Sequence, residues 1–263
     1  MDLGKNLGEA YDYTRAFLSD VGRLILLIVL GIIPIVNLIV AGYLYRIMGE
    51  PPVSKEPPPL KDYGETWVKG LKILVVALVY FIIPAILTVP LLWAWVAPFR
   101  GWYGAWYDIY PRPPMAPSAF AFWAFPLFFV GILVAFFIAF FLAMAIVNMA
   151  KHDNLGKAFA FSEIWGVITR VGVGSYLLWL IVIFILCVVV GALGSVPYIG
   201  WLISLAVSPI LGVFVARSAS LVYSEGAPPE IEAVPPEEEA PPKEEKPTRK
   251  KRPTRKKKGP PKK

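Results

Sequence analysis

The chain has 263 residues, 57% of them hydrophobic, and a mean hydropathy of +0.60. These values exclude an ordinary soluble domain, whose apolar segments are interrupted by charged surface positions, and they indicate an integral membrane protein. The formal net charge of +7 comes mostly from the C-terminal tail, so it does not describe the rest of the chain.

The first two predicted elements are an amphipathic helix and a broken apolar segment. Residues 1–21 place apolar side chains on one helical stripe, so this helix lies in the membrane interface or packs on the end of a bundle. Residues 24–45 are uncharged, with Pro34 and Asn37 near their centre. Because proline removes a helical hydrogen bond, the segment is either a kinked span or a re-entrant pair of half-helices.

Three further apolar segments contain no charged residue, namely residues 73–98, 119–150 and 171–216. A bilayer core about 30 Å thick needs about 20 apolar residues in a helix that crosses it. The last segment is long enough for two passes, and Ser195 and Pro197 favour a turn between them. These segments therefore predict four full spans.

Two more amphipathic helices are predicted at residues 60–73 and 154–171. Each carries a glutamate two residues before a tryptophan: Glu65 and Trp67, and Glu163 and Trp165. A similar small–Glu–x–aromatic pattern occurs in residues 8–11, so either one kind of interfacial helix was built three times or a unit was duplicated. The glutamates either pair with neighbouring basic residues or belong to a site for a partner or a lipid headgroup.

Together these elements predict an all-α, polytopic membrane protein with four full spans, a Pro-broken first apolar segment and three interfacial amphipathic helices. A re-entrant first segment puts most basic residues of the connections, and all three amphipathic helices, on one side of the membrane. Basic residues favour the cytoplasmic side. We therefore expect a multi-pass protein of the cell membrane with a helical domain at residues 1–223 and a cytoplasmic tail.

Small residues recur every four positions in two of the apolar segments. Such ridges let helix backbones approach closely in a membrane, where lipid supplies no hydrophobic drive for association. We therefore expect the third and the last apolar segments to touch along their ridges. The ridge residues are Gly131, Ala135, Ala139 and Ala143 in the third segment, and Ser204, Ser208, Gly212 and Ala216 in the last.

The tail, residues 224–263, has the composition of a disordered segment, because it is rich in proline and charge and has little to bury. An acidic stretch comes first, and residues 249–263 then hold ten basic residues and no acidic one. Such a segment attracts anionic lipid headgroups, RNA or DNA. The candidate partner-binding residues are Arg249, Lys250, Lys251, Arg252, Arg255, Lys256, Lys257 and Lys258.

Few residues suited to catalysis or metal binding occur in the chain. It has one histidine, His152, and one cysteine, Cys187, and the apolar segments contain no ionisable acid or base of the kind that proton pumps use. His152 next to Asp153 lacks a nucleophile signature. We therefore expect neither an enzyme nor a cofactor, but a membrane scaffold or interaction protein; the alternative is a permease for a small, weakly polar solute.

Several stretches carry a family resemblance: IPIVN followed by GYLYR, DYGETWVKGLK, VPYIGW and VFVARSASLVY. Over residues 1–223 they resemble an uncharacterised family of archaeal and bacterial membrane proteins, domain of unknown function 4013. They are also distantly similar to the membrane region attached to some glycerophosphodiester phosphodiesterases, although the chain has no phosphodiesterase domain. The resemblance implies a helical membrane architecture and no activity. Abundant proline and the absence of glutamine are typical of a thermophilic source.

Overall fold

The computed structural model describes residues 2–104 and 119–228, except for the side chains of residues 83, 87, 89–104 and 119–128. Its contacts divide the chain into the unit Met1–Pro228 and the segment Pro229–Lys263. The described residues form helices joined by turns, without strands. In chain order these are α1 (Leu3–Leu18), α2 (Val21–Ile32), α3 (Leu38–Gly49), α4 (Tyr63–Gly104), α5 (Ala119–His152), the 3-10 helix η1 (Leu155–Phe159), α6 (Phe161–Val171), α7 (Val173–Gly194) and α8 (Gly200–Gly226).

The first apolar segment is divided into two short helices. The turn at residues 33–37 separates α2 from α3, and each helix has 12 residues, or about 18 Å of length. Arg23, near the start of α2, has its Nη1 3.4 Å from the hydroxyl of Tyr43 near the middle of α3. The segment therefore folds back on itself, and neither helix alone is long enough to cross a bilayer.

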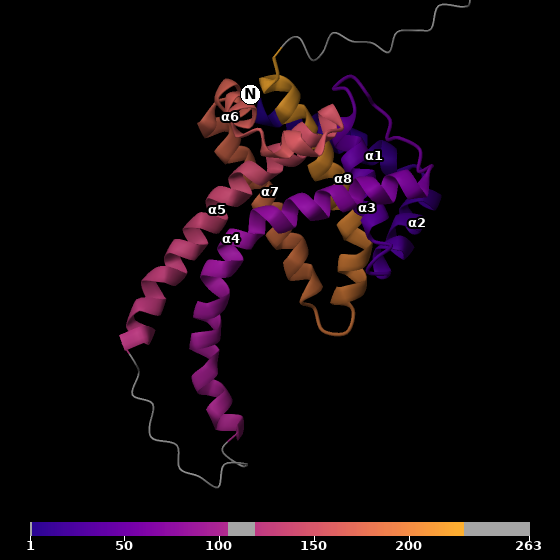
Figure 1. The fold of residues 1–263 in the computed structure, drawn as a ribbon. Coiled ribbons are helices and arrows are strands. Elements are labelled where there is room, and N and C mark those ends of the chain that lie inside the picture. The colour runs from indigo at the N-terminus through magenta and orange to yellow at the C-terminus, as the bar shows by residue number, and fades with distance from the viewer. Residues whose placement is uncertain (1, 105–118, 229–263) are drawn as a thin grey trace, which may run out of the picture. The chain divides into compact units, whose positions relative to one another are not determined.

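The described chain repeats one arrangement three times, in which an amphipathic segment precedes a pair of apolar helices. These groups are α1 with α2 and α3, the first turns of α4 with the rest of α4 and α5, and α6 with α7 and α8 (Figure 1). The second helices of the pairs, α3, α5 and α8, contact one another. Each amphipathic segment packs on the second helix of another group, since α4 begins against α3, α6 lies on α5 and α1 lies on α8.

The second amphipathic segment and the span after it form one continuous helix, although the sequence predicts two elements. α4 begins at Tyr63 with an acidic first turn and continues to Gly104, changing direction along its length (Figure 1). The third amphipathic segment, which the sequence predicts as one helix, is instead divided into two. η1 covers Leu155–Phe159, and α6 begins at Phe161.

α3 and the start of α4 approach each other closely at two glycines. A Cβ atom on Gly42 would overlap the carbonyl oxygen of Thr66 and lie 2.9 Å from the nitrogen of Gly70. A Cβ atom on Gly70 would overlap the carbonyl oxygen of Leu38. Because the obstructing atoms belong to the backbone, only glycine fits at both positions.

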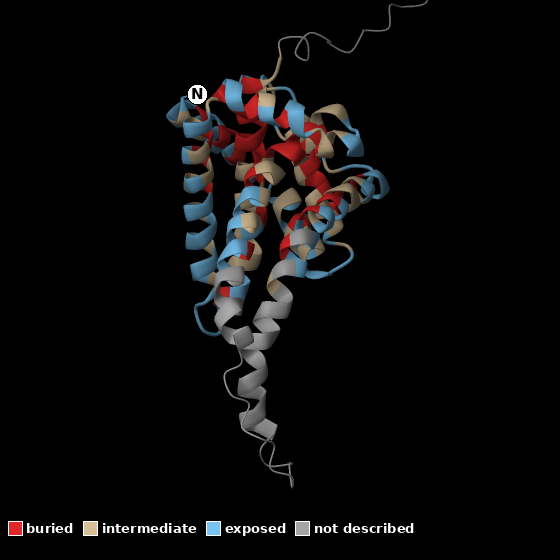
Figure 2. Ribbon diagram, turned by 60° about the vertical axis from the view of Figure 1, so that its left-hand side comes forward, coloured by how far each residue is buried: buried red, intermediate tan, exposed pale blue. Residues whose placement is uncertain are grey.

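Three described helices are long and apolar enough to cross a membrane: Phe129–His152 in α5, Val173–Gly194 and Gly200–Gly226. Their buried residues gather toward one end, where α5 and α8 finish and α7 begins (Figure 2). Met144, Tyr176 and Trp179 are fully buried there, whereas Phe184 and Trp201, toward the other end of the α7–α8 pair, are exposed. The helices therefore share a packed core at one end and present apolar surface over the rest.

The small-residue ridges face different neighbours from those expected. A Cβ on Gly131 of α5 would collide with the side chain of Thr88 in α4, so this part of the ridge serves the α4–α5 pair. Gly212 of α8 faces Leu44 of α3, and Ala216 is buried with residues of α1 and α3. Gly131, Gly212 and Ala216 thus pack against α4, α3 and α1, and Ser204 faces Gly194 of α7, so the contact between α5 and α8 does not run through these ridge residues.

Candidate functional site

Polar side chains gather where the three central helices α3, α5 and α8 end. Each helix end meets an amphipathic segment or a connecting loop at a junction. These junctions lie at the end of the molecule that also holds the packed core.

At the first junction, Arg217 of α8 is only 3% exposed. Its guanidinium donates hydrogen bonds to the carbonyl oxygens of Pro51, Pro52 and Ser54, at 3.1, 2.5 and 2.5 Å. It also lies 4.7 Å from the centre of the Tyr13 ring, in a cation–π contact. One buried cation thus fastens the proline-rich linker after α3 to α8, with α1 packed beside it.

Glu50 completes this first junction. Tyr13 donates a 2.6 Å hydrogen bond to its carboxylate, and Ser220 of α8 donates to its backbone carbonyl at 3.4 Å. Burial raises the pKa of Glu50 above its ordinary value, although the hydrogen bond from Tyr13 and the charge of Arg217 oppose that shift. Because the carboxylate is bonded and next to a cation, it is accommodated without an isolated buried charge.

At the second junction, Asn148 of α5 is fully buried and satisfied on both sides of its amide. Tyr223 of α8 donates to its Oδ1 at 2.6 Å, and its Nδ2 donates to the carbonyl of Lys157 at 2.9 Å. Lys157 in turn pairs with Glu163 at 2.7 Å. The hydrogen bond from Lys157 lowers the pKa of Glu163. This network joins α8, α5, η1 and α6.

The third junction lies between α3, α4 and α5 and contains an open pocket. The hydroxyl of Tyr45 donates to Asp153 at 2.9 Å, and Lys72 pairs with the same carboxylate at 2.8 Å. Burial works against ionisation of Asp153, but these two hydrogen bonds outweigh it and lower the pKa. The pair therefore fixes the end of α5 against both other helices.

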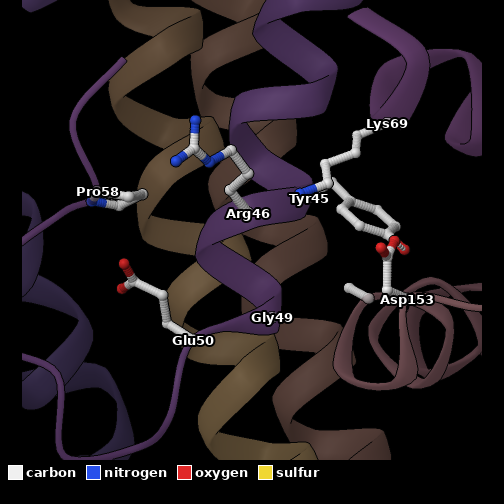
Figure 3. A pocket seen from close by; sticks show the side chains of 8 residues that line it. Tyr45, Arg46, Gly49, Glu50, Pro58, Lys69 and Asp153 are labelled. Carbon is white, nitrogen blue, oxygen red and sulfur yellow. Dashed lines mark hydrogen bonds between the residues drawn. The ribbon is translucent and has the colours of Figure 1, made fainter. Parts of the chain in front are cut away.

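The pocket beside this pair has a volume of about 330 Å³. Figure 3 shows Gly49 in its middle, with the carboxylates of Glu50 and Asp153 on opposite sides. Its volume is in the range of small-ligand pockets, and its walls offer cations, carboxylates and a phenol. The lining residues are Tyr45, Arg46, Gly49, Glu50, Pro58, Lys69, Ala150 and Asp153.

The four interfacial residues singled out in the sequence lie at two of these junctions. Glu65 is exposed and pairs with Lys69 at 2.7 Å, and the Trp67 indole donates to the carbonyl of Ile35 at 3.0 Å. That bond holds the turn between α2 and α3 against the start of α4. Glu163 belongs to the Asn148 network, and Trp165 stays largely exposed, with its ring centre 6.1 Å from that of Phe141.

The basic tail positions, Arg249 to Lys258, lie outside the described residues. His152 is placed, and its Nδ1 is 2.8 Å from the carbonyl oxygen of Asn148, which is an ordinary contact at a helix end. Cys187 is exposed on α7. No group of three or more potential metal ligands occurs among the residues described.

Sequence reasoning missed the residues that carry most of the buried polar contacts. Arg217 and Asn148 stand at the ends of long apolar runs, and Tyr45 and Tyr223 lie about one turn before the ends of α3 and α8. A polar residue at the end of a span is usually an interfacial anchor. Position in the sequence therefore did not distinguish the polar residues that are buried from those that face the interface. One available signal was that α3, α5 and α8 each end near an acid, at Glu50, Asp153 and Glu225.

Comparison with known proteins gives one family match. The family described as protein of unknown function (DUF4013) matches residues 25–199, which run from α2 to the turn before α8. The chain belongs to this family. No curated protein and no solved structure matches the chain. The match covers two of the three α-helical groups almost completely and ends before the last central helix.

Proposed function

We propose that this member of the family is a non-enzymatic membrane scaffold or interaction protein. The observation that carries the proposal is the packed core between the apolar helices. Met144, Val147, Trp179 and Val222 fill the space where α5, α7 and α8 meet, with Tyr176 closing it through a 2.7 Å bond to the carbonyl of Phe140. A core of this kind favours a scaffold over the alternative, a permease, which needs a continuous polar route between its spans.

The proposed topology has four full spans, α4, α5, α7 and α8, with α2 and α3 as a re-entrant pair. The short lengths of α2 and α3 and the bond from Trp67 to Ile35 support it, since they tie the turn to an amphipathic segment. All three amphipathic segments and the tail then lie in the cytoplasm.

Cysteine labelling tests this topology in a Cys187→Ala background. Single cysteines at the exposed positions Asp12, Lys61 and Gly156 are expected to react from one side of the membrane, and a cysteine at Tyr198 from the other. Tyr198 is 93% exposed in the α7–α8 turn and is a matched control for the far side. Labelling of position 12 from the same side as position 198 would contradict the re-entrant arrangement.

The proposed partner-binding element is the basic tail, which contacts anionic lipid or nucleic acid. Its charge supports this role, because each basic residue near an anionic surface contributes about 1 kcal/mol, and binding to RNA or DNA falls steeply with salt. The test compares the full chain, in neutral-lipid discs, with a chain ending at Pro228, against anionic vesicles and RNA over a salt titration. Equal binding by both chains at about 50 mM salt, where electrostatic contacts are strong, would remove the tail from the functional account.

A further inference from the structure

Polar contacts close two of the three junctions at the ends of α3, α5 and α8, whereas in the described part of the chain the third holds an open pocket with an arginine in its wall. In the Arg217 junction, linker carbonyls cover the guanidinium. In the Asn148 junction, Tyr223 and Lys157 occupy the amide. The third junction instead leaves the pocket of about 330 Å³ beside Gly49.

The charges around this pocket do not cancel. Lys72 pairs with Asp153 at 2.8 Å and Lys69 with Glu65 at 2.7 Å, so these groups neutralise one another. Glu50 accepts the hydroxyl of Tyr13 and faces the charge of Arg217.

Arg46 is the cation that remains. Its one hydrogen bond goes to the carbonyl of Lys61 at 3.1 Å, and none of the carboxylates in the described residues lies within ion-pair distance. A guanidinium with several unused N–H groups in the wall of a pocket suits the oxygens of a phosphate, which it binds through paired, charge-assisted hydrogen bonds.

We propose that this pocket binds a phosphate group through Arg46, and that a membrane phospholipid supplies it. The position supports a lipid as the source. Ala150, in the pocket wall, is two residues before the end of the apolar helix Phe129–His152, where the headgroup layer would begin. A free phosphate offers the same chemistry, so the experiment separates the two sources. The inference rests on the proposed membrane placement but not on the tail.

The test uses the full chain purified in a neutral detergent and titrated calorimetrically with a short-chain phosphatidylglycerol that stays monomeric. Arg46→Gln is expected to weaken binding about tenfold or more, because hydrogen bonds to a charged group are lost. Arg15→Gln, on the exposed face of α1, is the matched control and should change affinity less than about twofold, since one surface charge acts only through a screened field. The tail contributes equally to all three chains, so the difference reports the pocket.

Thermal unfolding of each variant shows whether it is folded. Arg46→Lys, which keeps the charge but removes the paired donors, supplies a second pocket variant if Arg46→Gln does not fold, and it too should weaken binding. Unchanged affinity in the folded pocket variants, or an equal loss in Arg15→Gln, would overturn the proposal. Displacement of the lipid by millimolar inorganic phosphate would make free phosphate the ligand, whereas lipid binding without displacement would assign the pocket to a phospholipid headgroup. The lipid affinities of the pocket variants can be interpreted even if cysteine labelling contradicts the proposed topology. The topology and the phosphate pocket can therefore be refuted independently.

Discussion

The close approach of α3 and α4 makes a sharp prediction for Gly42→Ala. The new Cβ would lie 2.7 Å from the carbonyl carbon of Thr66, where carbon atoms normally keep about 3.5 Å or more. The obstacle is backbone inside a helix, so it cannot rotate away, and because the carbonyl oxygen of Thr66 lies closer still, the two helices must separate by at least about 1 Å. A gap of that size forfeits a quarter to a half of each dispersion contact across the interface.

The cost follows from two opposing terms. Overpacking of this kind costs about 1–3 kcal/mol, and a backbone obstacle puts the value at the upper end. Alanine regains about 0.5–1 kcal/mol, because glycine is a poor helix former. The expected net loss is therefore about 2 kcal/mol of unfolding free energy. Gly70→Ala should cost a similar amount, since its Cβ meets Leu38 in the same way.

Reversible unfolding in mixed micelles, titrated with a denaturing detergent and followed by circular dichroism, measures these values. The double variant should lose less than the sum of the single losses, because helices already separated for one methyl group accommodate the second. Gly64→Ala is the control on the same helix, where an added Cβ meets no atom within 4 Å, and it should be neutral or stabilising. Losses below about 0.5 kcal/mol in both single variants would refute the close approach.

Three further predictions concern the junctions. Arg217→Met, which keeps an unbranched apolar stem but removes the donors to three carbonyls, should lower the unfolding free energy by about 3 kcal/mol in the same titration, and a loss below about 1 kcal/mol would contradict the anchoring role. Tyr223→Phe leaves the buried Oδ1 of Asn148 without this donor and should cost about 1–2 kcal/mol, whereas an unchanged midpoint would show that the bond contributes nothing. The hydrogen bonds to Asp153 hold the pKa of its carboxyl below the ordinary value. The ionised carboxylate therefore stabilises the folded protein above about pH 4, and this contribution is lost as the pH falls through the lowered pKa. Asp153→Asn should therefore lower stability at pH 7 and flatten this part of the acid-unfolding profile, and a parallel profile at all pH values would contradict the assignment.

The helical class, and the presence of helices apolar enough to cross a membrane, follow from the sequence alone. Long uncharged runs have one stable form in a bilayer, because every backbone hydrogen bond must be made within the segment, and the three described helices that are apolar enough to cross a membrane overlap the predicted apolar segments over most of their length. The break at residues 33–37 was also predictable, since Pro34 removes a donor from the helix. So was the turn between α7 and α8, where small residues and Pro197 interrupt an apolar run.

The candidate site depended on the tertiary structure. A buried arginine at position 217 and an open one at position 46 look the same in sequence, as each follows an apolar run. Their difference arises because the linker after α3 folds over the first and leaves a pocket beside the second. Likewise, a ridge of small residues shows that a helix can be approached closely, but it does not name the neighbour. Gly131 packs against α4, and Gly212 packs against α3. These neighbours follow from the order of the three helical groups around the central helices, and contacts between residues far apart in the chain decide that order.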